Sequence, residues 1–144
     1  MIYYLDASAW VKYYVREGSS PWVEAFWDKT PMCACSVLGP IEVMAAIRRR
    51  LSPGKTQLEP IFAEVCRQFQ GFQAIPLSLE ILRINQRMIV RHTLRGADLV
   101  HLSSMIYLQH LLDEPITLVA SDAELLNAAV AEGIATMDPA TTVC

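Results

Sequence analysis

Short apolar stretches alternate with longer amphipathic segments along this chain, and this alternation limits its possible folds more than any other feature. Each stretch is rich in β-branched or aromatic residues, whereas the segments between them have the apolar spacing of helices. The predicted strands are residues 2–6, 31–36, 72–77, 116–120 and 134–137. Strands that alternate with helices are typical of a parallel sheet that is covered on both faces. The sequence therefore predicts an α/β fold with three layers, α/β/α, around a central and mainly parallel sheet.

Seven helices are expected between and after these strands. Ser20 is expected to cap the second helix, with Pro21 at its first helical position. Ser52, Pro53 and Gly54 together indicate a turn, and Gly133 is expected to follow the end of the last helix. The predicted helices cover residues 8–16, 20–29, 37–51, 55–70, 78–92, 97–112 and 121–132.

Length and composition limit the functional classes. The chain has 144 residues, which suits one domain over residues 1–144. Although 53% of the residues are hydrophobic, no apolar run is long enough to span a bilayer, so the excess is expected to cover a dimer or partner interface. A net charge of −3 disfavours nonspecific nucleic-acid binding through a global basic field. The N-terminal segment does not have the pattern of a secretory signal, and a cytoplasmic location is expected.

Four acids stand at the junctions between predicted strands and helices. Asp6 follows the first strand, and Glu42, Asp98 and Asp122 lie in the first turns of later helices. Parallel strands bring their carboxyl ends to one edge of a sheet, so several of these acids should converge. Clustered carboxylates repel one another unless a cation lies between them. Oxygen ligands suit Mg²⁺ or Mn²⁺, and such ions can activate a water molecule and stabilise a phosphodiester under attack.

Each acid also has a structural explanation, because a negative charge near a helix N-terminus is favoured by the helix dipole. For Asp122 this alternative is especially good. Ser121 and Glu124 fit a capping box, with Ser121 as the capping residue and Glu124 reaching back to its backbone. A single acid at such a position is more often structural, and only the joint pattern of four favours a site.

Basic residues near Asp98 have two explanations each. His101 follows Asp98 by three residues and can share its helix face. A packed or hydrogen-bonded histidine is favoured there over a metal ligand. Arg91, His92 and Arg95 form a basic approach to Asp98, where they can hold RNA phosphates or pair with an acidic residue.

The order of three sequence stretches and one acid along this chain resembles that in the PIN-domain ribonucleases. The resemblance is greatest to the VapC-type toxins of toxin–antitoxin pairs. The stretches are residues 5–14 (LDASAWVKYY), 94–102 (LRGADLVHL) and 119–129 (VASDAELLNAA), with Glu42 between the first two. The resemblance spans nearly the whole chain and continues through residues 133–139.

The resemblance implies a PIN-like fold and a metal-dependent endoribonuclease that uses water as the nucleophile. Asp6 and Asp98 would be the main ligands of Mg²⁺ or Mn²⁺, and Glu42 and Asp122 would complete the catalytic site directly or through water. The products would carry a 5′-phosphate and a 3′-hydroxyl. The partners implied are an RNA substrate, a second copy in a homodimer and a cognate antitoxin. The helices over residues 10–27 and 42–50 would be the docking surfaces of the antitoxin.

Four further residues are expected near these acids or at the surface. Ser8 and Ser121 can hydrogen-bond a carboxylate or a water molecule, or contact RNA, although capping is the simpler role for both. Lys12 is expected to reach either solvent or phosphate. Asp138 is expected to be a surface turn residue.

Two other functional classes compete with the nuclease. A catalytically inactive PIN-like module that binds RNA or a protein partner is possible, but such a module would usually have lost an acid. A haloacid-dehalogenase-type phosphatase would carry a second acid two residues after Asp6, and a receiver domain would carry a late lysine, whereas the last lysine here is Lys55. The chain has no glycine-rich phosphate loop of the P-loop type.

Overall fold

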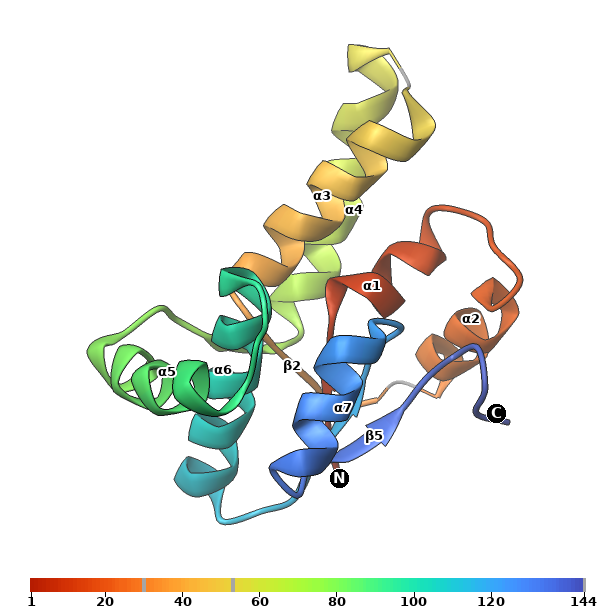
Figure 1. The fold of residues 1–144 in the computed structure, drawn as a ribbon. Helices are drawn as coiled ribbons and strands as arrows, with labels where there is room; N and C mark the ends of the chain where they lie inside the picture. Colours follow the sequence, from red (N-terminus) through yellow and green to blue (C-terminus); the bar gives the residue numbers. More distant parts are fainter. Residues whose placement is uncertain (30, 53, 144) are drawn as a thin grey trace.

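A five-stranded parallel sheet forms the centre of the molecule (Figure 1). The computed structural model describes residues 1–29, 31–52 and 54–143. The strands are β1 (Ile2–Leu5), β2 (Cys33–Ser36), β3 (Gln73–Ile75), β4 (Ile116–Val119) and β5 (Ala135–Met137). They lie in the order β3-β2-β1-β4-β5, and all four pairings are parallel. This arrangement confirms the predicted α/β fold and makes β1 the central strand.

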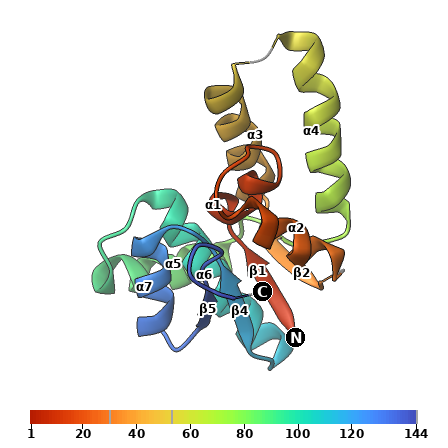
Figure 2. The same ribbon diagram turned by 90° about the vertical axis from the view of Figure 1, so that its right-hand side faces the viewer.

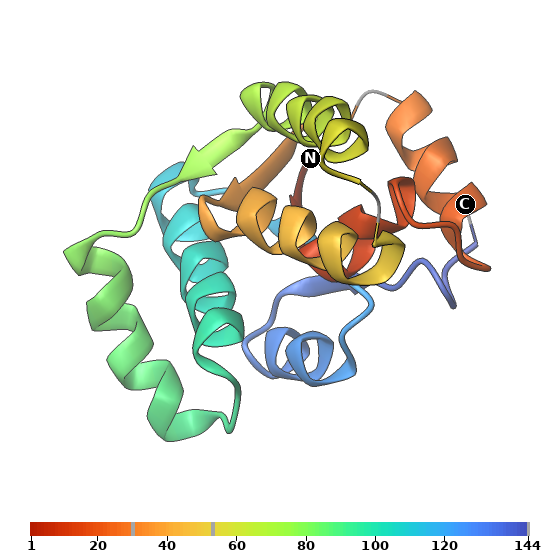
Figure 3. The same cartoon turned by 90° about the horizontal axis from the view of Figure 1, so that it is seen from above.

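Helices cover both faces of the sheet. They are α1 (Ala7–Trp10), its 3₁₀ continuation η1 (Val11–Tyr13), α2 (Ser20–Asp28), α3 (Leu38–Leu51), α4 (Lys55–Gln70), α5 (Leu79–Arg91), α6 (Gly96–Leu112) and α7 (Ala123–Ala131). Helices α3 and α4 pair as a hairpin that projects beyond the sheet (Figure 2). Seen from above, α5 and α6 lie on one side of this hairpin and α2 lies on the other (Figure 3).

The side chains of β1 alternate between two hydrophobic cores. Tyr4 packs in the core that contains Leu102 of α6, whereas Leu5 packs in the core that contains Trp10 and Val43. Tyr4 and Trp10 are both fully buried. A central strand packed on both faces is typical of a parallel sheet, and it gives the residue that follows it a rigid base.

The first helix is shorter than predicted. It ends as a 3₁₀ turn at Tyr13, because the Ser20 hydroxyl donates a 2.7 Å hydrogen bond to the Lys12 carbonyl, where a longer helix would need that acceptor. Ser20 is therefore not the cap of α2. The N-cap position is Ser19, which makes no capping hydrogen bond through its side chain.

Two positions predicted to end a helix or form a turn have the expected backbone conformation. Ser52 adopts a left-handed φ of 41° at the end of α3, and Gly133 adopts a φ of 76° after α7, where the lack of a Cβ makes that conformation easy. Pro53, the middle residue of the first turn, lies outside the described residues. Within the described part of the chain, no helix is both long and apolar enough to cross a membrane.

Candidate active site

Asp6 stands directly beyond the central strand and is almost completely buried, with 4% of its surface exposed. Its Oδ2 accepts hydrogen bonds from the Ser8 backbone N–H at 3.0 Å and from the Ser8 hydroxyl at 2.5 Å, so it caps the short helix α1. Its Oδ1 lies 3.8 Å from Nε2 of His101. Oδ2 of Asp6 is therefore held by the turn that follows Asp6, and Oδ1 faces His101 on α6.

The other three acids come from three different helices. Glu42 lies on α3 with its side chain about one-third exposed, and its Oε1 pairs with Nε2 of His101. Asp98 lies half-buried in the first turn of α6. Asp122 caps α7, because its Oδ1 accepts the Leu125 N–H at 3.1 Å.

The pKa of Asp98 responds to burial and to the other three acids. Burial raises the pKa of Asp98 to about 6, and the negative charges of Asp122, Asp6 and Glu42 add to that rise, whereas His101 opposes it. Among the described residues, however, no group of three Asp, Glu, His or Cys side chains is arranged as a ready-made metal site. Asp6 and Glu42 converge on Nε2 of His101, and one oxygen of Asp6, of Glu42 and of Asp122 is already bound by protein groups. The joint site of four acids stays a prediction.

His101 is hydrogen-bonded and completely buried, which confirms the favoured role at this position. Its Nδ1 lies 2.7 Å from the Tyr4 hydroxyl on β1, and its Nε2 contacts Glu42 on α3. Burial lowers the pKa of His101, but the hydrogen bond to Glu42 and the neighbouring negative charges outweigh it and raise the pKa above its ordinary value. The histidine thus links the middle of the sheet to the acids.

Lys12 points into the protein, so the expectation that it reaches solvent or phosphate is wrong. It is 7% exposed, and its Nζ donates to the Ser19 hydroxyl at 2.7 Å and to the Ser121 hydroxyl at 2.8 Å. Glu17 supplies a carboxylate at 3.9 Å. The cation is retained in the interior because these acceptors replace its water.

Ser121 connects the ends of three strands rather than capping α7, so the predicted capping box is wrong. Its N–H donates to the Ser8 hydroxyl at 2.9 Å, and its own hydroxyl lies 3.2 Å from Oδ1 of Asp138. Asp138 is therefore half-buried and bonded to the site edge, in addition to its place before a turn. Ser8 hydrogen-bonds a carboxylate, which is one of the two roles expected for it.

The basic residues before Asp98 divide into two groups. Arg91 and His92 both pair with Oε1 of Glu132, at 3.0 Å and 2.6 Å, which is the acid-pairing alternative. Arg95 is exposed immediately before α6, three residues from Asp98. A phosphate contact therefore remains a prediction that suits Arg95 better than Arg91.

Tyr4 is the site residue that sequence reasoning missed. Its hydroxyl accepts the Ser36 N–H at 3.0 Å and contacts His101. A phenol within a strand that must be buried on both faces needs a hydrogen-bond partner, and this requirement was the signal available in the sequence.

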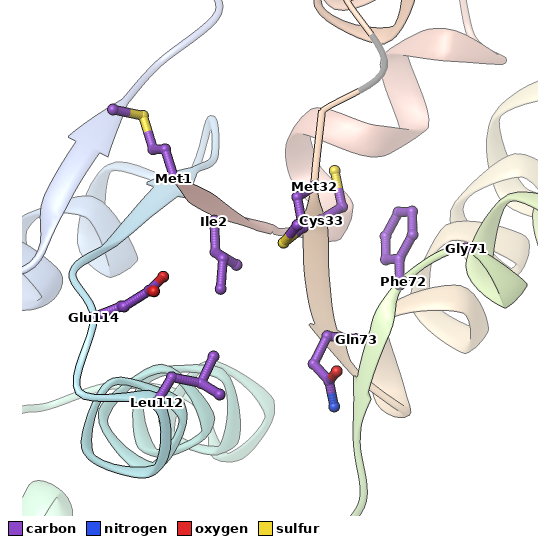
Figure 4. Close-up of a pocket in the computed structure, with 9 residues that line it drawn as sticks. All are labelled: Met1, Ile2, Met32, Cys33, Gly71, Phe72, Gln73, Leu112 and Glu114. Atoms are coloured by element: carbon purple, nitrogen blue, oxygen red, sulfur yellow. The ribbon is translucent and has the colours of Figure 1, made fainter.

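A cavity of about 580 Å³ lies at the opposite edge of the sheet. Ile2 of β1, Cys33 of β2 and Leu112 of α6 line it, all from the ends of elements that face away from the acids (Figure 4). The four acids are therefore not part of this cavity.

Replacing Lys12 with Met should lower the free energy of unfolding by about 2 kcal/mol, since it removes charge-assisted hydrogen bonds and leaves Ser19 and Ser121 without their donor. The control is Arg49→Met, which removes an exposed cation from α3. Urea unfolding of both variants measures the difference. Equal midpoints for the two variants would show that the buried ammonium contributes no stability.

Comparisons with known proteins agree with this geometry. No protein-family model matches the chain. Ribonuclease VapC45 of Mycobacterium tuberculosis (strain CDC 1551 / Oshkosh) and ribonuclease VapC49 of Mycobacterium tuberculosis (strain ATCC 25618 / H37Rv) are each 32% identical to it over 107 residues, covering 72% of this chain and 74% of the relative.

Solved structures of lower identity share the fold. The structure of FitAB bound to an IR36 DNA fragment has a TM-score of 0.72 at 16% identity, covering 100% of this chain and 99% of that one. FitAcB from Neisseria gonorrhoeae has a TM-score of 0.70 at 17% identity, covering 99% and 100%. VapBC2 from Rickettsia felis, bound to a promoter DNA fragment, has a TM-score of 0.62 at 16% identity, covering 96% and 98%. The curated relatives and the parallel sheet together lead to one conclusion: this chain belongs to the VapC ribonucleases, the PIN-domain toxin family that its sequence resembles.

Proposed function

We propose that this chain is a metal-dependent endoribonuclease toxin that hydrolyses RNA phosphodiester bonds with water at Asp6, Glu42, Asp98 and Asp122. The family membership supports the ribonuclease activity. The observation that carries the site assignment is geometric: Nε2 of His101 contacts Oε1 of Glu42 and lies 3.8 Å from Oδ1 of Asp6, and Asp98 precedes His101 by three residues on α6. The pKa of Asp98 agrees with this, because burial raises it and the neighbouring carboxylates add to the rise. Four carboxylates at the carboxyl edge of a parallel sheet stand where ligands of α/β proteins bind.

Mg²⁺ or Mn²⁺ suits these oxygen donors, because a divalent cation would offset the negative charges that add to the effect of burial and raise the pKa of Asp98. When bound, such an ion supplies the positive charge that activates a water molecule and stabilises the phosphodiester oxygens. Asp6 and Asp98 are the proposed main ligands, and Glu42 and Asp122 complete the site directly or through water.

The chain's own contacts already orient three of these acids. Ser8 holds Oδ2 of Asp6, His101 holds Oε1 of Glu42, and the Leu125 N–H holds Oδ1 of Asp122. In each case the second carboxylate oxygen is the one that can reach a cation. Holding one oxygen with protein donors limits rotation of the carboxylate and so lowers the entropic cost of binding.

Cleavage of total cellular RNA tests this function and its metal requirement. The purified protein should produce discrete fragments with Mg²⁺ or Mn²⁺, and none with EDTA, with activity restored by excess Mn²⁺. An Asp98→Asn sample purified in parallel controls for contaminating nucleases. Fragments that persist in EDTA or in the control would contradict the assignment. No cleavage together with no metal binding would favour an inactive RNA- or partner-binding module.

Partners belong to the same proposal. VapBC2 from Rickettsia felis and a complex from Klebsiella pneumoniae are toxin–antitoxin structures of this fold, and we propose that an antitoxin also binds this chain in the cytoplasm.

A homodimer is proposed as well. The proposal of a homodimer is supported by a group of exposed apolar side chains on α5, the kind of surface that protein interfaces cover. The group consists of Leu79, Leu82, Ile89 and Val90.

A further inference from the structure

His101 contacts the acidic group from the inside of the protein. Its side chain is completely buried, while the Glu42 side chain that it contacts is about one-third exposed. Oδ1 of Asp6 lies 3.8 Å from the same ring nitrogen. A buried group therefore stands between two acids from different parts of the chain, Asp6 just after β1 and Glu42 on α3.

Chemistry sets the direction of the hydrogen bond between His101 and Glu42. An ionised carboxylate can only accept, so Nε2 of His101 carries a proton and donates it to Glu42. The Tyr4 hydroxyl already accepts the Ser36 N–H, and its own proton can be donated to Nδ1 at 2.7 Å. In the neutral ring the chain of donors runs from the backbone of β2 through Tyr4 and His101 to Glu42; in the protonated ring Nδ1 donates to the Tyr4 oxygen, and Nε2 still donates to Glu42.

This chain of donors gives Glu42 a fixed orientation that its own helix does not supply. A glutamate side chain near solvent loses considerable rotamer freedom when it is held in one place. Here the group that holds it is a ring locked by full burial and by a tyrosine of the central strand. With Oε1 of Glu42 bound to His101, its Oε2 is the oxygen left for a ligand.

We propose that His101 is a positioning residue, which holds Glu42 in the orientation needed to bind a divalent cation. The inference rests on the proposed metal-dependent function and adds a residue to it. Protein groups that hydrogen-bond a metal-binding carboxylate typically affect metal affinity by about 10- to 100-fold.

Two amide substitutions separate the two nitrogens of His101. The amide nitrogen of Gln occupies nearly the place of Nε2, so His101→Gln retains a donor to Glu42 but loses the contact with Tyr4. The amide end of Asn occupies nearly the place of Nδ1, so His101→Asn retains an acceptor for Tyr4 but loses the contact with Glu42. The pair is matched in chemistry and differs in which contact survives.

Binding of Mn²⁺ alone, followed by isothermal titration calorimetry and by the loss of its free EPR signal, is the main readout. We expect His101→Asn to weaken Mn²⁺ binding by about 10- to 100-fold and His101→Gln to stay within about 3-fold of the native protein. In a Glu42→Ala background, His101→Asn should cause little further loss, because the two residues act together. Thermal unfolding of each metal-free variant shows whether it is folded.

The inference would be overturned if His101→Asn bound Mn²⁺ as tightly as the native protein. It would also be overturned if both amide variants lost the same Mn²⁺ affinity while being equally stable. Should His101→Asn fail to fold, His101→Leu removes the same donor to Glu42 with an apolar side chain of similar size and should weaken Mn²⁺ binding by about 10- to 100-fold; unchanged binding there would also overturn it. Failure of the proposed function is distinguishable, because it is judged on the native protein. A native chain that binds no Mn²⁺ contradicts both proposals, whereas native cleavage with unchanged binding in the variants contradicts only the role of His101.

Discussion

Asp98→Asn should abolish RNA cleavage, with a loss on the order of 1,000-fold, and should at the same time stabilise the metal-free protein. The loss follows because an amide cannot replace a negatively charged metal ligand. The gain follows because burial and three neighbouring acids raise the pKa of Asp98 to about 6, so its ionised form is unfavourable in the folded state. After allowance for solvent screening at this half-buried position, the gain above pH 6 is about 1 kcal/mol.

The pH dependence identifies the cause of this gain. The folded pKa of Asp98 is above the unfolded value, so as pH rises the carboxyl ionises first in the unfolded chain, and this ionisation favours unfolding. The stability difference between the variant and the native protein should be absent below about pH 4 and should develop as pH rises to about 6. Above that value it should remain constant.

Thermal unfolding in EDTA, from pH 4 to pH 8, measures this difference, and Glu114→Gln is the control because it changes an exposed acid before β4 to its amide. Mn²⁺ should raise the unfolding temperature of the native protein more than that of the variant, because binding to the folded state alone stabilises it. An Asp98→Asn protein that is less stable than the native protein at pH 7, or that still cleaves RNA, would contradict the assigned role.

Local pattern predicts the elements and the positions of the acids well. Asp6 could be placed because an apolar strand runs directly into it, and the parallel sheet could be inferred from the alternation of strands and helices. The structure confirms both. The end of the first helix was harder to place, because it depends on a hydroxyl from the next helix, that of Ser20, which bonds the Lys12 carbonyl.

Contacts between distant segments could not be predicted from spacing. The Ser8 hydroxyl meets the Ser121 N–H only because β1 and β4 pair in a register that sets Leu5 beside Val119. Ser121 and Asp122 are both good capping residues, and the local sequence does not decide between them. Ser121 is instead bonded to Lys12 from η1, which leaves the cap to Asp122.

Gly39→Ala should lower the free energy of unfolding by about 2 to 3 kcal/mol, although glycine to alanine in a helix ordinarily adds about 1 kcal/mol. Gly39 lies in the first turn of α3, where the helix passes over β2. A Cβ at this position would lie 2.1 Å from Sγ of Cys35, a side chain that is completely buried. Helix α3 would have to move, and because α3 also carries Glu42, RNA cleavage should fall with stability.

Removing the sulfur should reverse the effect. In Gly39→Ala with Cys35→Ala, the new Cβ meets the Cβ of residue 35 at 3.6 Å and Cζ3 of Trp10 at 3.8 Å, both ordinary van der Waals contacts. The double variant should therefore be at least as stable as Cys35→Ala alone, a coupling of 2 kcal/mol or more, on the order expected for residues in direct contact. Urea unfolding of the native protein, both single variants and the double variant measures this coupling.

Gly96→Ala is the matched control, since a Cβ there meets no atom within 4 Å and should not destabilise α6. Strictly additive effects would mean that α3 does not depend on close contact with Cys35, and Glu42 would then be positioned by His101 and the hairpin alone.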